Sequence, residues 1–180
     1  FLERVHIETE SAIVVIAGNH DSGQRLGTAS KLFDRNRILV RGPVSNDELP
    51  LVLEDGAGPV AISALPYAEI YAARRAFGDE SIRSPEDVLR AQIAAAKAHV
   101  PETARWIVVA HAFVTNCQPS ESERTLSVGT VETVPSSIFD GANYVALGHL
   151  HRPQIAGRDS IRYSGSPLAF GFDEAGTTKS

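Results

Sequence analysis

Four short apolar runs constrain the fold of this 180-residue chain more than any other feature. They cover residues 12–17, 59–65, 106–110 and 144–147. The runs are rich in Val and Ile and do not alternate with polar residues, which is typical of strands covered on both faces. A fifth run at 37–42 ends in a Gly-Pro turn and predicts a further strand.

Residues 84–100 carry the clearest helix signal. Ser84 suits the N-cap, Pro85 suits the first helical position, and two acidic residues follow in the first turn. Apolar residues then recur on one face at helical spacing: Leu89, Ile93, Ala96 and Val100. Because this helix leads directly into the strand at 106–110, the order strand, helix, strand predicts a layered α/β fold.

The remaining segments are less regular. Residues 24–34 are a weaker helix candidate, and residues 1–10 read as the end of a helix. The polar stretch 116–134 predicts a long surface loop of the kind that often carries function. The tail at 158–180 predicts a strand, a Gly/Ser/Pro turn and an unfinished second strand.

Composition narrows the function. The 43% apolar content and the length favour a single domain over residues 1–180. A net charge of −5 argues against a general basic surface for nucleic acid, so any contact with DNA would be local and helped by metal ions. The one cysteine, Cys117, excludes an internal disulfide and a Cys-rich zinc site. We expect a reducing compartment and no membrane association, since no apolar run reaches transmembrane length and no signal peptide is visible.

Polar side chains follow three of the predicted strands where each strand ends. Asn19 and His20 follow the first, His111 follows the third, and His149 and His151 follow the fourth. Ligands bind at the carboxyl ends of strands in open α/β sheets. If these strands are parallel neighbours, the five side chains converge on one rim.

The residue types indicate a metal. Imidazole and amide oxygen without thiolate favour a catalytic centre over structural zinc. Asp21 is expected to orient a neighbouring group rather than to ligate. His6, in the opening helix, and His99, expected in the last turn of the helix at 84–100, are predicted to be structural.

These motifs resemble a known family. "GNHD" at 18–21, a strand ending in His111, and "GHLH" at 148–151 resemble the calcineurin-like metallophosphoesterases. "VIAGNHDS", "VVAHAFV", "FDGANYVALGHLHRPQ" and "RYSGSPLAFGFDE" are similar to SbcD-type DNA exonuclease subunits over nearly the whole chain. The resemblance implies a layered metallophosphoesterase-type sheet sandwich flanked by helices. It also implies hydrolysis of DNA phosphodiester bonds with two divalent metal ions, most often Mn²⁺, in DNA repair, recombination and replication.

The resemblance also assigns roles residue by residue. Asn19, His111 and His149 would ligate the second metal, and His151 would ligate the first. His20 would be the catalytic histidine that protonates the leaving oxygen.

Three further residues are candidates for contact with substrate, each with a structural alternative. Arg152 would contact a backbone phosphate or support its loop, or else form a surface salt bridge. Ser164 and Ser166 would present hydroxyl or amide groups to the site, or else belong to a tight turn set by Gly165 and Pro167.

The sequence departs from the family pattern at its start. Neither the Asp-x-His motif nor the Gly-Asp motif of the family occurs before Asn19, and the chain begins with Phe1 and contains no methionine. We therefore expect a partial nuclease domain, truncated at both ends, whose isolated form lacks a competent two-metal centre.

The resemblance implies partners as well: DNA, the SMC-like ATPase subunit SbcC, and a second nuclease subunit, in the bacterial cytoplasm. Two alternatives stay open. One is a metallophosphoesterase acting on small phosphoesters, and the other is a non-catalytic interaction module for an ATPase.

Overall fold

The computed structural model describes residues 2–28, 30, 37–120, 123 and 133–176. In chain order its elements are α1 (Leu2–Thr9), β1 (Ile13–Ile16), α2 (Gly23–Thr28), β2 (Ile38–Arg41), β3 (Leu51–Asp55), β4 (Gly58–Leu65), α4 (Ile70–Phe77), α5 (Pro85–Lys97), β5 (Arg105–His111), the 3₁₀ turn η3 (Ser136–Phe139), β6 (Tyr144–Gly148), β7 (Gln154–Ala156), β8 (Arg158–Tyr163) and the 3₁₀ turn η4 (Phe172–Glu174). The predicted α/β class is confirmed.

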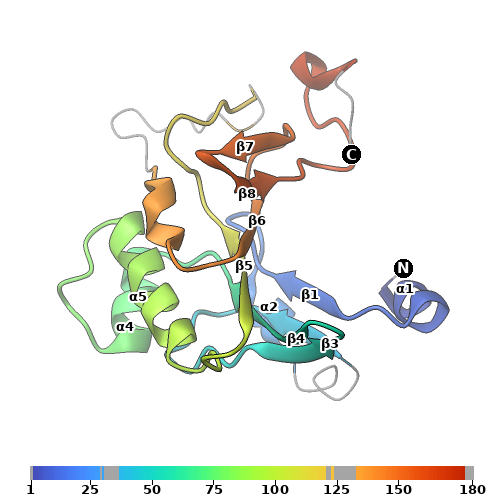
Figure 1. Ribbon diagram of the computed structural model, residues 1–180. Helices are drawn as coiled ribbons and strands as arrows, with labels where there is room; N and C mark the ends of the chain where they lie inside the picture. The colour runs from blue at the N-terminus through green and yellow to red at the C-terminus, as the bar shows by residue number, and fades with distance from the viewer. Residues whose placement is uncertain (1, 29, 31–36, 121–122, 124–132, 177–180) are drawn as a thin grey trace.

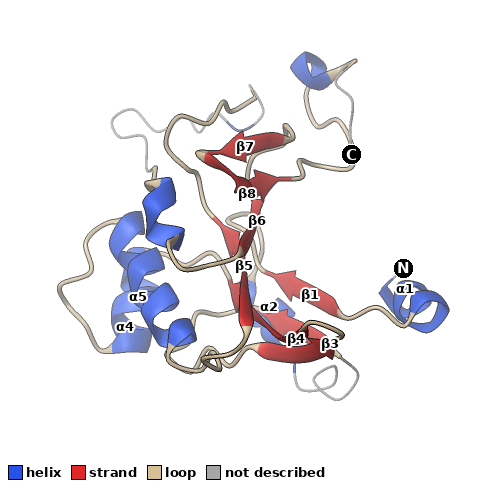
Figure 2. Ribbon diagram, in the orientation of Figure 1, coloured by secondary structure: helices blue, strands red, loops and turns tan. Residues whose placement is uncertain are grey.

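The main sheet has six strands in the order β3-β4-β5-β6-β8-β7. The four inner strands run parallel, and the edge strands β3 and β7 run antiparallel to their neighbours. Figure 1 shows α4 and α5 on one side of this sheet and β1 on the other side. Figure 2 shows the same arrangement by element type. The carboxyl ends of the parallel strands therefore share one edge of the sheet.

All five predicted strands form, but they do not share one sheet. β1 pairs in parallel with β2, in the register Ile13↔Ile38, and these two strands make a separate sheet. The condition that the three strands ending in Asn or His are parallel neighbours in one sheet is thus not met by β1. This strand instead packs as a second layer against β4 and β5. Coverage on both faces is also incomplete, since β1 is only half-buried and β5 alternates buried with half-buried residues.

The helix α5 begins as predicted. Ser84 is the N-cap, its hydroxyl accepts a hydrogen bond from the Asp87 N–H at 3.1 Å, and the Asp87 carboxylate accepts from the Ser84 N–H at 3.0 Å. This reciprocal pair is a capping box. The helix ends at Lys97, so His99 lies beyond its last turn rather than within it. Bonds from i to i−3 tighten the chain there, and Pro101 disfavours further helix.

The core lies between the six-stranded sheet and the elements that cover it. Its largest fully buried apolar side chains include Leu65, Val108, Phe139, Val145 and Ile161. Four of these five side chains come from strands of the sheet, and Phe139 comes from η3. Because strand registers set the positions of the strand ends, this packing determines which polar residues meet at the sheet edge.

Several elements differ from expectation. As far as Gly176, where the described residues end, the tail does not form a second strand after β8. It turns at Gly165, where φ is +78°, and then enters η4. Pro167 contributes to this, because it has no N–H to donate to a strand ladder. The sequence also did not predict β3, β7 or α4, whose N-cap Glu69 makes no side-chain capping bond.

The stretch 116–134 lies partly outside the described residues. Its described parts are not all on the surface, because Ser120 and Val134 are 1% and 2% exposed. The predicted helix at 24–34 is described only at 24–28 and 30, where α2 confirms its first part. Within the described residues, no helix combines the length and apolar character needed to cross a membrane.

Candidate functional site

Three of the predicted site residues meet at the carboxyl ends of β1, β5 and β6. His111 Nε2 lies 2.9 Å from Asn19 Oδ1 and 3.3 Å from His149 Nδ1. The two imidazole rings meet edge to face, with centroids 5.2 Å apart. Asn19, His111 and His149 therefore form one cluster of donor atoms, which we call the triad.

Strand register explains why His111 and His149 lie together. β5 and β6 are parallel, and His111 is opposite Gly148, so the next residue, His149, is carried to the His111 ring. Asn19 arrives from the second sheet. The N–H of Tyr67, just after β4, donates to the carbonyl of Ala17 at 2.9 Å and ties the end of β1 to the main sheet.

Two glycines allow the His111 ring to fit. A Cβ on Gly18 would lie 2.7 Å from His111 Cε1, and a Cβ on Gly148 would lie 3.2 Å from His111 Nδ1. The first distance is well inside ordinary carbon contact. The glycines of "GNHD" and "GHLH" are thus required by the space that the imidazole occupies.

The backbone at His149 is strained. Its φ is +113°, a region that L-residues rarely adopt and that commonly marks functional sites. The ring packs against Phe113, with centroids 5.7 Å apart. The fold therefore maintains a costly conformation that aims this imidazole at His111.

Burial favours the neutral form of both triad histidines. Burial lowers the pKa of His111 to about 4, repulsion from His149 and His20 lowers it too, and Asp21 opposes the shift. Burial likewise lowers the pKa of His149, against the attraction of Glu123. A neutral imidazole is the form that binds a metal ion.

His20 and Asp21 lie beside the triad. The His20 side chain is exposed, and its charge influences both His111 and His149. Asp21 Oδ2 accepts a hydrogen bond from the Gly18 N–H at 2.7 Å. Asp21 thus closes the turn that presents Asn19 and His20.

The spacing of the triad suits a metal ion. With metal–donor bonds of about 2.1 Å, adjacent donors lie about 3.0 Å apart in an octahedron and about 3.4 Å apart in a tetrahedron. The distances from His111 Nε2 to Asn19 Oδ1 and to His149 Nδ1, 2.9 and 3.3 Å, match these values. Among the described residues, no group of three or more His, Cys, Asp or Glu is arranged to hold a metal. The triad has three metal-donor atoms because the Asn19 amide oxygen adds to the two imidazole nitrogens.

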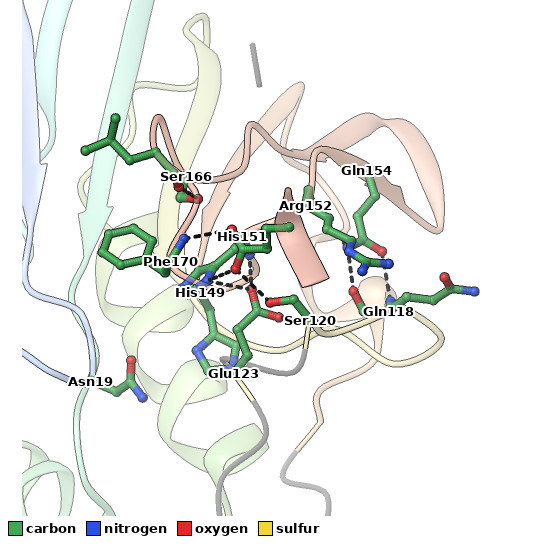
Figure 3. Close-up of polar contacts among 12 residues, drawn as sticks. Asn19, Gln118, Ser120, Glu123, His149, His151, Arg152, Gln154, Ser166 and Phe170 are labelled. Carbon is green, nitrogen blue, oxygen red and sulfur yellow. Dashed lines mark hydrogen bonds and ion pairs between the residues drawn. The ribbon is translucent and has the colours of Figure 1, made fainter. Parts of the chain in front are cut away.

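His151 belongs to a neighbouring cluster. Its Nδ1 lies 2.9 Å from Glu174 Oε1 and 3.6 Å from Glu123 Oε1, and the Glu123 carboxylate also accepts the His151 backbone N–H. Ser120 donates through its hydroxyl to Glu174 at 3.2 Å and through its N–H to Glu123 at 2.7 Å. Figure 3 shows Ser120 and Glu123 gathered beside His149 and His151, with Asn19 on the far side of His149.

The three substrate-contact candidates lie in or near this cluster. Arg152 is half-buried, and its carbonyl accepts a bond from Gln154 Nε2 at 3.4 Å. Ser166 donates its N–H to the His151 carbonyl at 3.1 Å and its hydroxyl to the Leu168 carbonyl at 2.6 Å. Ser164 is exposed. Ser166 therefore lies in a hydrogen-bonded turn.

Sequence reasoning missed four residues at this edge. Tyr67 meets the His111 ring edge to face at 6.1 Å, and Ser120, Glu123 and Glu174 surround His151. Glu174 falls within "RYSGSPLAFGFDE", so the motif that carried the resemblance contained it. The other three had no local signal, because only the fold brings them to the histidines.

No protein-family model matches the chain.

Proposed function

We propose that this chain is the nuclease domain of an SbcD-type subunit that hydrolyses DNA phosphodiester bonds with divalent metal ions. The triad carries the proposal, because two neutral imidazoles and an amide oxygen converge at separations suited to one ion. The layering of a small parallel sheet, a larger mixed sheet and helices is compatible with the metallophosphoesterase-type sandwich.

In this proposal the chain's residues have separate tasks. Asn19, His111 and His149 hold one ion, and His151 serves a second. Two bound Mn²⁺ ions would supply an activated water and neutralise charge on the phosphate. His20, exposed beside the triad, donates a proton to the departing sugar oxygen as a general acid.

The proposal also covers the partners of the chain and its cellular location. DNA is the substrate, the SMC-like ATPase subunit SbcC is a partner, and two nuclease subunits form a dimer in the bacterial cytoplasm. Since the net charge of the chain is −5, DNA contact is expected to be local, through the metal ions and through Arg152, Ser164 or Ser166 at the same edge.

The test is the variant His20→Ala, assayed for Mn²⁺-dependent cleavage of linear duplex DNA. Loss of a general acid lowers the cleavage rate by about 10²- to 10⁴-fold. The full-length protein is used, because this chain has no Asp-x-His or Gly-Asp motif before Asn19. Manganese binding should be unchanged. The control is His99→Ala, since His99 is exposed and faces Asp47 at 3.6 Å, away from the triad.

Unchanged cleavage in His20→Ala would refute the acid assignment. A comparison of linear duplex DNA with a small nitrophenyl phosphodiester separates nuclease from small-molecule phosphoesterase, and faster turnover of the ester would favour the latter. Titration of the isolated chain with Mn²⁺ tests the non-catalytic alternative. We expect one ion at the triad. Two tightly bound ions would contradict the prediction that this chain alone lacks a complete centre.

A further inference from the structure

A fully buried carboxylate lies directly behind His151. The Glu174 side chain has no solvent exposure, and its Oε1 lies 2.9 Å from His151 Nδ1. The same oxygen accepts from the Ser120 hydroxyl at 3.2 Å, and Oε2 accepts from the Phe170 N–H at 3.3 Å. Burying a carboxylate is costly unless hydrogen-bond donors surround it. The donors around Glu174 offset this cost.

The segment 164–176 holds His151 from several directions. The Ser166 N–H donates to the His151 carbonyl at 3.1 Å, and the Phe170 ring packs against the imidazole with centroids 5.1 Å apart. Gly165 makes this possible, since a Cβ there would lie 2.7 Å from the His151 carbonyl oxygen. Figure 3 shows Ser166 and Phe170 on the same side of His151.

The hydrogen bond to Glu174 determines which nitrogen of His151 carries the proton. While the Glu174 carboxylate is ionised it can only accept hydrogen bonds, so Nδ1 donates to it. In the neutral ring the lone pair is then on Nε2. Glu123 Oε1, 3.6 Å from the same Nδ1, favours the same tautomer.

We propose that Glu174 is a positioning residue that fixes the orientation and tautomer of His151 and so presents Nε2 to a metal ion. This inference rests on the proposed function for the identity of the ion. Carboxylates behind metal-binding histidines commonly serve this purpose, and their loss weakens metal affinity by about 10- to 100-fold. The "FDE" end of the last quoted motif thereby gains a role.

The isosteric variant Glu174→Gln tests the inference sharply. The Phe170 N–H can only donate, so the single carbonyl oxygen of the amide must face it. The amide NH₂ then faces His151 Nδ1, whereas the Ser120 hydroxyl can rotate to accept. His151 would have to accept at Nδ1 and carry its proton on Nε2, which blocks the nitrogen meant for the metal.

The first measurement is the ¹⁵N NMR spectrum of the His151 ring, recorded without metal at alkaline pH. We expect the Nδ1–H form in the wild-type chain and the Nε2–H form in Glu174→Gln. The matched control is Glu54→Gln, on the exposed side of β3, which should leave the spectrum unchanged. An Nε2–H wild type, or an unchanged tautomer in folded Glu174→Gln, overturns the inference. The wild-type arm decides the question even if the variant does not fold.

The second measurement is calorimetric titration with Mn²⁺ of the full-length protein. We expect Glu174→Gln to weaken binding at one of the sites by about 10- to 100-fold, while the triad site keeps its affinity. Equal affinities at all sites would overturn the role of Glu174 in metal binding. If the wild type binds no Mn²⁺, the proposed function fails and the metal part of the inference fails with it. The tautomer measurement still decides whether Glu174 orients His151.

Discussion

Substitution of Gly18 by alanine tests the geometry of the triad directly. The new Cβ would lie 2.7 Å from His111 Cε1 and 3.0 Å from His111 Nδ1. Ordinary carbon contacts are about 3.5–4.0 Å, so the ring must retreat by about 1 Å. It has little room, because Gly148 also lies close to His111 Nδ1 and Asn19 Oδ1 faces Nε2 at 2.9 Å.

The consequence should appear in stability and in metal binding. Overpacking of this size costs about 1–3 kcal/mol, and displacing a ligand from its support weakens metal binding by about 10- to 100-fold. Urea denaturation measures the first effect, and calorimetric titration with Mn²⁺ measures the second. The stability measurement needs no metal, so it tests the packing independently of the proposed function.

The chain offers a matched control. Gly56 lies in the turn between β3 and β4, and a Cβ there meets nothing within 4 Å. Gly56→Ala should therefore leave stability and metal binding near wild type. Gly148→Ala, with a contact of 3.2 Å, should fall between the two. If Gly18→Ala were as stable as Gly56→Ala and bound Mn²⁺ equally well, the placement of His111 would be refuted.

Three further predictions concern the scaffold. Tyr163→Phe removes a buried hydroxyl that donates to the Ala112 carbonyl at 2.6 Å and accepts from the Val114 N–H at 2.9 Å. The free energy of unfolding measured in urea should therefore fall by about 2 kcal/mol, and an unchanged free energy would contradict this. His149→Gly should be more stable than His149→Ala by about 1 kcal/mol in thermal unfolding, because φ of +113° suits glycine; the reverse order would argue against strain. Burial raises the pKa of Glu48 from 4.5 to about 7, so the folded state keeps a proton that the unfolded state releases. Stability is unaffected below pH 4.5, falls by about 3 kcal/mol between pH 4.5 and 7 and then levels off, a loss that Glu48→Gln should remove in urea titrations across this range.

Local signals predicted the elements that carry strong chemical patterns. The Val- and Ile-rich runs became β1, β4, β5 and β6, and the Ser-Pro start of α5 formed its cap as expected. α4 was missed because its N-cap, Glu69, makes no side-chain capping bond. β3 and β7 are edge strands whose formation depends on their neighbours β4 and β8, and short-range patterning does not report such pairing.

The candidate site divides in the same way. The residues whose type and spacing announce chemistry, Asn19, His111 and His149, could be named from the sequence because each directly follows or ends an apolar strand. Their approach to 2.9 and 3.3 Å could not, because it depends on the β5–β6 register and on the layering of β1 against the main sheet. Ser120 gives no chemical signal in the sequence, and Glu174 lies within a quoted motif that assigned it no role.

The sequence by itself determined the α/β class and the strand ends that carry polar side chains. The tertiary structure alone decided that β1 lies in a second sheet, that His149 adopts a strained backbone, and that Glu174 is buried behind His151. The physical reason is the separation along the sequence over which each interaction acts. Caps, periodicity and turn chemistry act within a few residues, whereas these three features arise from contacts between segments distant in the chain, whose free energy exists only once the core has packed.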